Sequence, residues 1–449
     1  MKLDLPEPVD YILEEFEKSG FEIYIVGGAV RDLVMGKILY DWDFTTNATP
    51  EEMLKLFPEA YYTNEFGMVG IPNDPRPFEI TTFRTEHGYS DSRRPDKVSW
   101  GKSLKEDLKR RDFTINAMAL RKSDKNTYEL IDHFKGKSDL AKKLVRAVGD
   151  PQERFSEDAL RMMRAVRIAA ELDFKIEEKT LNAIQANAKT IERISKERVR
   201  DELLKTLASA HPYEGIILLR ESNLLEELIP ELEKTFGVEQ KSPGRHHIYD
   251  VGTHSLMALK YCPSTDPVVR FATLIHDIGK PQTFKKMPNG TLTFYNHELV
   301  STRIAKRISE RLKFSKKQSD KLIKLVRWHQ FTVDEHQTDS ALRRFIRHVS
   351  TDYLADMLDL RVGDRLGGGA TETSWRLEEF KKRLVEVQKQ PFSITDLKID
   401  GKDVMQELNI NPGPTVGQVL KTVFEEVVDK KLPNEKKDLL ARLKSFKSN

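Results

Sequence analysis

Hydrophobic and polar positions follow two different periods along the chain, and the change comes near residue 150. Before this point, the runs EIYIVG, MVGIP and FEITTF are short, apolar and rich in β-branched residues, as strands are, and they alternate with helix-like stretches such as VDYILEEFEKSG. After it, FSEDALRMMRAVRIAAEL and ERVRDELLKTLASA repeat their apolar residues at helical spacing. The pattern predicts a multidomain α+β protein, with an N-terminal mixed α/β head followed by all-α modules.

Loop-forming residues divide the helical part further. The strings KSPGRHH, GGG and NPGPTVG begin at residues 241, 367 and 411. The predicted domains are a head at 1–150, a helical neck and body at 151–240, a histidine-rich module at 241–366 and a helical tail at 367–449.

Composition narrows the class of protein. With 449 residues, 39% hydrophobic and 32% charged, the chain has room for about three folded domains. Its 74 Lys and Arg residues against 71 Asp and Glu do not by themselves indicate a nucleic-acid-binding protein. The single Cys262 excludes an intrachain disulfide, and no apolar run approaches the roughly 20 residues of a membrane span. We expect a cytoplasmic protein with no membrane partner; its oligomeric state is not predicted.

The first candidate chemistry lies in the stretch FEIYIVGGAVRDLVMGKILYDWD. Asp41 and Asp43 are two residues apart, so in a strand they point to the same side and could jointly bind Mg²⁺. Two such ions can bridge an attacking hydroxyl and a triphosphate. Gly27 and Gly28 would let the backbone approach phosphates, and Arg31 could add a charged contact. A bare D-x-D pair is more often a turn or a solvent-facing pair.

Longer motifs change that balance. GGAVRD followed by DWDF, and then LKRRDFTINAMAL, resemble the class II tRNA nucleotidyltransferase and bacterial poly(A) polymerase family. The resemblance implies that Arg111 helps to hold the triphosphate, that Asp112 reads the ribose and that Asn116 supports the nucleotide pocket. The polar segment RTEHGYSDSRRPDKVSWG corresponds to a flexible loop that is shortened in relatives adding only CC, which implies that this chain completes the final A.

The stretch SEDALRMMRAVR is predicted to open a helix, with Ser156 as its N-cap. Asp158 and Arg161 are then neighbours on the helix surface, where a random pair of this kind contributes about 0.5 kcal/mol or less. The family has the motif E-D-x-x-R here. The resemblance implies that Asp158 and Arg161 bind the Watson–Crick edge of the incoming base, with Glu157 holding Arg161, so that C and A are accepted.

Two further groups of cations are candidates for phosphate contact. Arg164 and Arg167 follow at the spacing of the family, and the alternative is that they are solvated helix charges. Residues 302–327 hold ten Lys or Arg against two acidic residues, which RNA contact and a solvated helical face explain about equally well. The family grips the acceptor arm of tRNA with its neck, body and tail helices.

Eight of the eleven histidines fall between residues 246 and 348, which suggests a metal site. His254, His276, Asp277 and Asp364 lie within helix-like apolar patterns, and imidazole with carboxylate suits a transition metal or Mg²⁺. A water bound to that metal could become a hydroxide nucleophile. The pattern H…HD…D resembles the HD phosphohydrolase superfamily, which implies a divalent metal whose identity the sequence does not give.

Other residues of this HD module are weaker candidates. Lys280 could contact phosphate, and His297 and His329 could be further ligands or phosphate contacts, although a lone histidine is more often structural. Some members of the nucleotidyltransferase family carry such a module and show metal-dependent phosphatase or cyclic phosphodiesterase action on RNA ends.

The leading hypothesis is template-independent addition of CCA to the 3′ end of tRNA, with CTP, ATP and Mg²⁺, together with HD-module activity on RNA ends. In it, Asp41 and Asp43 are catalytic. The nearest alternative is an A-adding tRNA nucleotidyltransferase or poly(A) polymerase. A second alternative is an HD phosphohydrolase whose head only binds nucleotide, and a third is a non-catalytic RNA-binding chaperone.

Overall fold

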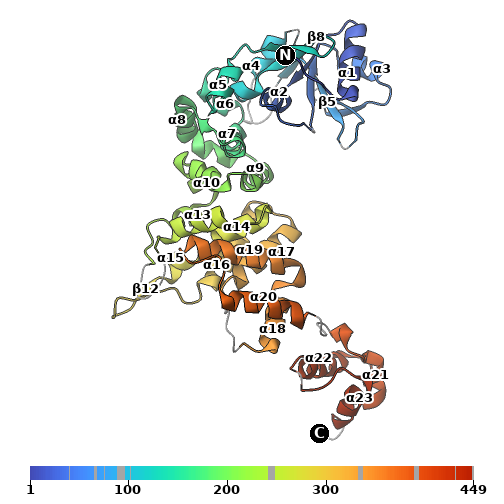
Figure 1. Cartoon of the computed structure of the whole chain (residues 1–449), viewed down its shortest axis with the longest axis vertical. Helices are drawn as coiled ribbons and strands as arrows, with labels where there is room; N and C mark the ends of the chain where they lie inside the picture. The colour runs from blue at the N-terminus through green and yellow to red at the C-terminus, as the bar shows by residue number, and fades with distance from the viewer. Residues whose placement is uncertain are drawn as a thin grey trace. The chain divides into compact units, whose positions relative to one another are not determined.

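The computed structural model describes residues 1–39, 41–64, 68–74, 76–87, 97–101, 103–240, 248–331, 337–388, 394–429 and 431–446. The chain divides into two compact units: Met1–Glu233 with Ile308–Phe314, and Lys234–Arg307 with Ser315–Asn449 (Figure 1). The four predicted domains are a finer division and stay a prediction. The middle of the predicted loop, residues 88–96, and the string KSPGRHH lie outside the described residues.

A seven-stranded mixed sheet forms the centre of the head, in the order β3-β4-β5-β2-β1-β8-β9. Neighbours β2 and β5 are parallel, and the other neighbouring pairs are antiparallel. The runs EIYIVG, MVGIP and FEITTF form β1, β4 and β5, as predicted. The strands are β1 Ile23–Val26, β2 Asp43–Thr46, β3 Tyr61–Asn64, β4 Met68–Ile71, β5 Phe78–Thr82, β8 Ala119–Asp124 and β9 Thr127–Ile131.

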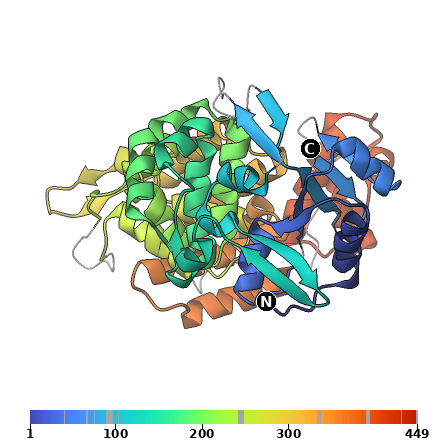
Figure 2. The same ribbon diagram turned by 90° about the horizontal axis from the view of Figure 1, so that it is seen from above.

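The first helix of the head, α1 (Glu7–Lys18), buries one apolar stripe. In α1, Val9, Ile12, Leu13 and Phe16 recur at helical spacing and are buried. Figure 2 shows the N-terminus beside the teal hairpin of β8 and β9, where the backbone N–H of Leu3 donates to Asn126. The remaining head elements are α1 Glu7–Lys18, α2 Gly28–Val34, α3 Pro50–Leu56, α4 Leu104–Lys109, η1 Thr114–Asn116, α5 Gly136–Ala141, and the two-stranded pair β6 Arg84–His87 and β7 Lys97–Trp100.

The rest of the first unit is helical, apart from a short parallel pair of strands. Its elements are β10 Leu144–Val145, α6 Pro151–Glu157, α7 Leu160–Leu172, β11 Lys175–Ile176, α8 Glu178–Asn187, η2 Ala188–Arg193, α9 Lys196–Ala208, α10 Pro212–Glu221, α11 Leu224–Leu228 and α12 Pro230–Glu233. The prediction that Ser156 caps the base-reading helix is wrong. Ser156 lies in the last turn of α6, and its hydroxyl donates to the carbonyl of Glu153. Asp158 instead breaks the helix, and its carboxylate accepts from the backbone N–H of Leu160 at 2.9 Å.

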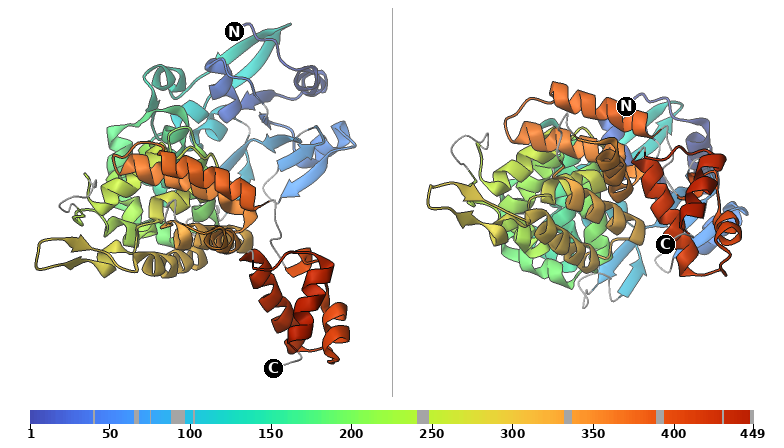
Figure 3. Two further views of the ribbon diagram at one scale, coloured as in Figure 1. Left: turned by 60° about the horizontal axis from the view of Figure 1, so that its bottom comes forward. Right: turned by 90° about the horizontal axis from the view of Figure 1, so that it is seen from below.

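The second unit is built from helices and one short hairpin. Its elements are α13 Val251–Tyr261, α14 Pro267–Ile275, α15 Lys280–Thr283, β12 Lys285–Lys286, β13 Leu292–Thr293, α16 His297–Arg311, α17 Lys316–Trp328, α18 Asp339–Val349, η3 Thr351–Tyr353, α19 Leu354–Gly367, α20 Trp375–Val387, η4 Ile394–Asp396, α21 Gly401–Leu408, α22 Pro414–Val428 and α23 Lys436–Ser445. The last three helices, red in Figure 3, bury a core of their own that includes Val404, Val423 and Leu439.

The predicted order of a mixed head followed by helical modules is confirmed. The small hairpin of β12 and β13 was not predicted within the helical part. In the described ranges, no helix combines the length and the apolar character that a membrane crossing needs.

Candidate nucleotide site and metal centre

A glycine turn opens the candidate nucleotide site. β1 ends at Val26, and Gly27 has a φ of 72°, in the left-handed region that favours glycine. A Cβ atom on Gly27 would lie 3.1 Å from Asp43 Oδ2 and 3.3 Å from Arg111 Nη1. Gly28 then begins α2. The missing side chain of Gly27 therefore leaves space at the point where a carboxylate and a guanidinium converge.

The two aspartates differ in their surroundings. Asp43 is the first residue of β2 and is partly buried, whereas the side chain of Asp41 is 67% exposed and accepts from Arg76 at 3.2 Å. Trp42 between them is buried, which fits the alternation of an extended chain. Burial, together with the charges of Asp41 and Glu79, raises the pKa of Asp43 to about 6, although Arg111 opposes the rise.

Glu79 was not predicted. It stands opposite Asp43 in the parallel register of β2 and β5 and adds to the local negative charge. Its neighbours Phe78 and Ile80 are buried while Glu79 is exposed, and this alternation is visible in the run FEITTF. Within the described residues, the head contains no group of three donor side chains close enough to hold a metal ion by themselves.

A hydrogen-bond network joins the two head motifs to α7. Arg31 donates to both oxygens of Asp32, at 2.9 and 2.8 Å, and to Asn116 Oδ1 at 3.0 Å. Asn116 donates to Asp112 Oδ1 at 3.2 Å, and Arg164 donates twice to Asp112 Oδ2, at 2.8 and 2.6 Å. Burial opposes ionisation of Asp112, but Arg164 outweighs it and lowers the pKa of Asp112 to about 2. Asp112 is therefore a charged structural link as well as a candidate ribose contact.

The side chain of Arg111 pairs with a buried carboxylate that was not predicted. Asp107 accepts from Arg110 at 2.6 Å and from Arg111 at 3.3 Å, and it is fully buried. Asp107 precedes these arginines by three and four residues on α4, a helical spacing that the sequence LKEDLKRRD contains. Among the described residues, Arg111 Nε is buried without a hydrogen-bond partner.

The candidate base-reading residues lie around the break between α6 and α7. Arg161 donates to Glu157 Oε2 at 2.6 Å, and Asp158 Oδ2 accepts from Arg198 Nη2 at 2.8 Å. Arg198 comes from α9 and was not predicted, because nothing in the sequence connects positions 158 and 198. In the described part of the chain, Arg198 Nη1 is buried without a partner. Binding of the base by Asp158 and Arg161 stays a prediction.

The other predicted phosphate contacts are paired with carboxylates. Arg164 binds Asp112, as described above, and Arg167 donates to Glu202 at 2.7 Å and to Glu171 at 2.8 Å. A phosphate could reach these guanidinium groups only in competition with those partners.

The basic segment 302–327 occupies most of α16 and nearly all of α17. Part of its charge is balanced: Arg311 pairs with Glu231 at 2.8 Å, and Lys321 pairs with Asp266 and Asp356, each at 2.8 Å. Its role in RNA contact stays a prediction.

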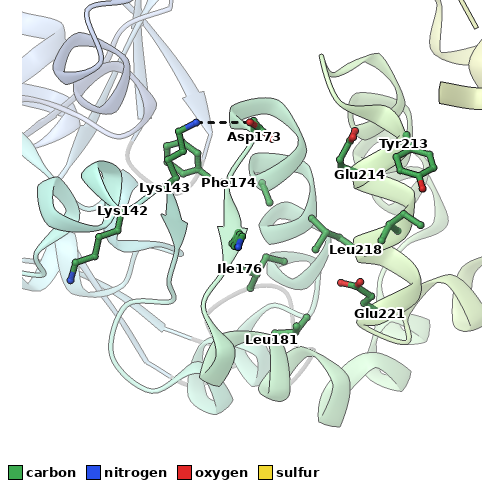
Figure 4. Close-up of a pocket in the computed structure, with 13 residues that line it drawn as sticks. Lys142, Lys143, Asp173, Phe174, Ile176, Leu181, Tyr213, Glu214, Leu218 and Glu221 are labelled. Carbon is green, nitrogen blue, oxygen red and sulfur yellow. Dashed lines mark ion pairs between the residues drawn. The ribbon is translucent and has the colours of Figure 1, made fainter. Parts of the chain in front are cut away.

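A cavity of about 780 Å³ in the first unit lies apart from these residues. Apolar side chains such as Phe174 and Leu218 line it, with Lys142, Lys143 and Glu214 among its polar residues (Figure 4). None of the predicted nucleotide-binding residues lines it. This cavity is therefore not the candidate nucleotide site, which is defined by the residue types around Gly27.

The predicted HD residues come together in the second unit. His254 lies on α13, His276 and Asp277 follow α14, and Asp364 lies on α19. His254 Nε2 lies 3.3 Å from His276 Nε2, 3.5 Å from Asp277 Oδ2 and 3.2 Å from Asp364 Oδ1. His276 Nε2 lies 3.2 Å from Asp277 Oδ2 and 3.6 Å from Asp364 Oδ1. These donor atoms point at one another, as the ligands of a metal ion do.

Glycines explain how the helices come so close. A Cβ atom on Gly363 would lie 2.6 Å from the carbonyl oxygen of Ala258, and one on Gly367 would lie 2.5 Å from the backbone nitrogen of Ala258. Only glycine therefore fits at these two positions of α19, and the close contact with α13 brings Asp364 to His254. Gly279, in the turn after Asp277, also leaves no room for a Cβ atom. Its missing side chain lets this turn pack against the first turn of α16.

His297 and His329, the weaker candidates, belong to the same cluster. His297 begins α16 and His329 follows α17, and their Nε2 atoms are 3.3 Å apart. They lie 3.2 and 3.7 Å from Asp277 Oδ1. Lys280 Nζ is buried, 2.6 Å from Asp277 Oδ2 and 2.8 Å from Gln240 Oε1. Two groups of three residues could each hold a cation, and Asp277 belongs to both.

The electrostatics of the cluster favour bound positive charge. Burial opposes protonation of His276, but Asp277 and Asp364 outweigh it and raise the pKa of His276 to about 10. Burial opposes ionisation of Asp277 as well, yet His276 and Lys280 hold the pKa of this carboxyl well below its ordinary value. Burial lowers the pKa of His329, which favours the neutral imidazole that a metal needs.

Comparison with known proteins gives matches along the whole chain. Residues 23–146 match the "Poly A polymerase head domain", residues 173–236 match the "Probable RNA and SrmB- binding site of polymerase A", and residues 291–443 match domain 2 of tRNA nucleotidyltransferases. The CCA-adding enzyme of Pediococcus pentosaceus is 35% identical over 96% of this chain and 95% of its own length. That of Lactococcus lactis subsp. cremoris is 33% identical over 99% of each.

Solved structures of CCA-adding enzymes are also similar to this chain. The Bacillus stearothermophilus CCA-adding enzyme in complex with CTP has a TM-score of 0.75 and 26% identity, covering 99% of this chain and 98% of that one. The Thermotoga maritima CCA-adding enzyme complexed with tRNA has a TM-score of 0.61 at 19% identity, covering 99% of this chain and 96% of that one, and so shares the fold.

Proposed function

The chain belongs to the family of CCA-adding enzymes, and from this premise we propose that it adds C, C and A to the 3′ end of tRNA, with CTP and ATP as substrates and no nucleic-acid template. The observation that carries this proposal is the likeness to a CCA-adding enzyme over 96% of the chain at 35% identity. We also propose a cytoplasmic location for the protein, which agrees with a tRNA substrate. The A-adding enzymes and poly(A) polymerases stay the nearest alternative, because their head motifs resemble these.

The reaction joins the 3′-oxygen of the RNA to the α-phosphorus of a nucleotide. The bond from that phosphorus to pyrophosphate breaks, and the hydroxyl loses its proton. Asp41 and Asp43 fit a divalent cation here by ligand type: Asp43 lies beside the space that Gly27 leaves open, and Asp41 is near enough to raise the pKa of Asp43. Mg²⁺ suits such oxygen ligands, and when bound it would favour ionisation of the hydroxyl and neutralise charge on the departing pyrophosphate.

The side chains around this position act on the nucleotide. Arg111, fixed by Asp107, directs Nη1 of its guanidinium toward the space beside Gly27, where it can donate to a phosphate oxygen. Arg31 is oriented by Asp32 and Asn116, which leaves its charge at the start of α2. Because these cations are positioned before the nucleotide arrives, little reorganisation is needed when charge develops.

Base selection is assigned to the break between α6 and α7. Arg198 holds one oxygen of Asp158, and Glu157 holds Arg161, so both base-reading groups have fixed orientations. A carboxylate accepts from an exocyclic amine and a guanidinium donates to ring nitrogen or carbonyl, a pair that suits C and A. Residues 302–327 and the tail helices are the proposed contacts to the body of tRNA.

The experiment uses tRNA that lacks its three terminal nucleotides, with intact tRNA as the control substrate. We expect two additions with CTP alone, three with CTP and ATP, and none with UTP, GTP or ATP alone. Incorporation of ATP in the absence of CTP would contradict the proposal and favour an A-adding enzyme or poly(A) polymerase.

We propose a second activity, hydrolysis of phosphate esters at RNA ends, for the histidine cluster. The observation that favours it is the convergence of two histidines and two aspartates from α13, α14 and α19 at separations of 3.2–3.6 Å. His254, His276, Asp277 and Asp364 fit a divalent metal by ligand type and by this geometry. When bound, such a metal supplies a water activated for attack on phosphorus.

The second activity is tested with RNA that ends in a 2′,3′-cyclic phosphate or a 3′-phosphate. The intact chain should open the cyclic ester or release inorganic phosphate when a divalent metal is added, and Asp277→Ala should not. Asp250→Ala, which removes a capping carboxylate on the same unit, is the matched control. Equal hydrolysis by the intact chain and by Asp277→Ala would contradict this assignment.

A further inference from the structure

We propose that a cavity beside the histidine cluster binds the unpaired terminal base of an RNA, and that this base stacks on the exposed ring of Tyr295. The inference rests on the second proposed activity and names a feature that its substrate must have, a base on the nucleotide that carries the terminal phosphate. Tyr295 selects the substrate and takes no part in the chemistry.

The cavity joins the histidine cluster to the hairpin of β12 and β13. Its volume is about 330 Å³, at the lower end of the range of about 300 to 1,000 Å³ that small-molecule sites have. Phe294, Tyr295 and Asn296, which follow β13, line it together with His297 and Lys280. Only the last two of these belong to the histidine cluster. The cavity therefore extends from the cluster to an aromatic segment that the second proposed activity does not use.

Tyr295 presents a flat apolar ring to water. In the described part of the chain it is the most exposed Phe, Tyr or Trp side chain, at 73%. Phe294 beside it packs on Phe284, with ring centroids 5.8 Å apart, so the segment is held in place by its neighbours. Bases stack on exposed aromatic rings of this kind when proteins bind single-stranded RNA. The rim of the cavity thus has the side chain that a terminal base needs.

The backbone fixes Tyr295 relative to His297. Residues two apart in an extended chain point to the same side, but Asn296 between them has a φ of 61°, in the left-handed region that asparagine tolerates. Tyr295 is therefore exposed while His297 is buried. The carbonyl of Phe294 accepts from the backbone N–H of His297 at 3.2 Å and lies 2.8 Å from His297 Nδ1, which fastens the turn.

This turn sets a short distance between the two ends of the cavity. Two residues span at most about 7 Å, which is comparable with the length of one nucleotide from its phosphate to its base. A terminal phosphate held beside His297 therefore has its own base within reach of the ring of Tyr295.

The charge around the cavity fits RNA. Residues 278–297 include three lysines, Lys280, Lys285 and Lys286, and no Asp or Glu. Lys285 and Lys286 are exposed on β12, in the hairpin that projects from the helices of the second unit (Figure 3). Cations at these positions can contact the phosphates of the nucleotides that precede the terminal one.

Polar side chains complete the lining. Asn296 and Gln330 line the cavity and are exposed, and their amide groups can both donate to and accept from the edge of a base. Glu298, an acidic residue in the lining, pairs with Arg327 at 3.7 Å, so its charge is partly balanced. The cavity therefore combines an aromatic face with hydrogen-bonding groups, as sites for unpaired bases do.

The first test compares two RNA oligonucleotides that end in a 3′-phosphate, one of them with a terminal nucleotide that lacks its base. Phosphate release by the full chain is measured with added Mn²⁺. We expect kcat/KM to be about tenfold higher for the RNA with the base, mainly through a lower KM, as one stacked base provides. Tyr295→Ala should remove this preference, and Tyr295→Phe, which keeps the ring, should retain it. Tyr261→Ala, an exposed tyrosine on α13, is the matched control and should also retain it.

Two results of this test would overturn the inference and leave the second activity standing. One is equal hydrolysis of the two oligonucleotides by the intact chain. The other is a preference for the base that survives Tyr295→Ala.

The second test needs no turnover. RNA with 4-thiouridine 3′-phosphate as its terminal nucleotide is mixed with the full chain and a metal chelator and is then irradiated, and the crosslinked peptides are identified by mass spectrometry. A crosslink to the peptide that contains Tyr295 would support the inference even if no hydrolysis is found, and only the second activity would then fail. Crosslinks confined to the head, or none at all, would overturn the inference.

Discussion

The two candidate metal sites of the chain are built in opposite ways. In the head, Asp41 is 67% exposed on its side chain and paired with Arg76, Asp43 is partly buried, and the groups around them are mainly guanidinium groups. In the second unit, His254 and His276 are 1% exposed and their donor atoms already lie at the separations of metal ligands.

The difference fits what each site is proposed to bind. Mg²⁺ keeps several waters and is usually held by one or two carboxylates together with substrate phosphates. On the proposed function, the head uses arginines to place a triphosphate, and the triphosphate completes the metal site. Imidazole ligands bind transition metals without help from a substrate. We expect the histidine cluster to bind metal in the free protein and the head to bind it only with a nucleotide.

The largest expected effects come from two variants that each inactivate one of the two sites. Asp43→Ala should slow nucleotide addition by roughly 10³-fold, about 4 kcal/mol, because the carboxylate beside Gly27 is lost, and should leave hydrolysis at RNA ends intact. Asp277→Ala should have the reverse pattern. Rates of CTP addition and phosphate release are measured for both variants. Loss of both activities in either variant would show that the sites are not independent.

A smaller effect is expected on base selection, which is proposed for the break between α6 and α7 in the first unit. Asp158→Ala should reduce the preference for CTP over UTP by about 2 kcal/mol, roughly 30-fold, because one hydrogen-bonding group for the base is lost. The ratio of kcat/KM for the two nucleotides is the measurement, and Asp201→Ala, on an exposed face of α9, is the control. An unchanged ratio would mean that Asp158 only pairs with Arg198.

Close packing of α19 on α13 is expected to matter for the cluster and not for nucleotide addition. Gly363→Ala places a methyl group 2.6 Å from the carbonyl of Ala258, so it should lower stability by about 1 to 3 kcal/mol and weaken metal binding, with nucleotide addition unchanged. Gly417→Ala on α22 meets no atom within 4 Å and should be neutral or stabilising. Denaturant unfolding and metal content test both variants, and equal behaviour would contradict the packing argument.

The smallest effect concerns pH. The pKa of Asp43 is raised to about 6, so this carboxyl takes up a proton as the pH falls through that value and ceases to bind a cation. At pH 5 about one Asp43 in ten is ionised, so the Mg²⁺ concentration for half-maximal CTP addition should rise about tenfold from its value at pH 8. Glu79→Gln removes a charge that raises this pKa and should move the dependence to lower pH. A half-maximal Mg²⁺ concentration that does not change with pH would contradict the assignment of Asp43 as a cation ligand.

The elements that depend on local sequence were predicted, and those that depend on distant contacts were not. The strands EIYIVG and FEITTF, and the glycine turn before Asp43, follow from patterns within a few residues. The pairing of Asp158 with Arg198 joins residues 40 apart, and no local pattern indicates it. The error at Ser156 has a local cause, because Asp158 competes for the same role of helix cap two residues later.

The histidine cluster shows the same division. Its residues are visible in the sequence as an excess of histidines, but the approach of Asp364 to His254 is not. It depends on Gly363 and Gly367, whose contact is Ala258, more than 100 residues away in the chain. The sequence pattern therefore predicted the candidate ligands, while their convergence required the packing of the helices.

The most direct test of this account is anomalous diffraction from crystals soaked with Mn²⁺, with and without CTP. Without CTP we expect anomalous density only in the histidine cluster, and with CTP a further peak between the triphosphate and the carboxylates of Asp41 and Asp43. Bound CTP with no metal at Asp41 and Asp43, or a histidine cluster free of metal in both crystals, would contradict it.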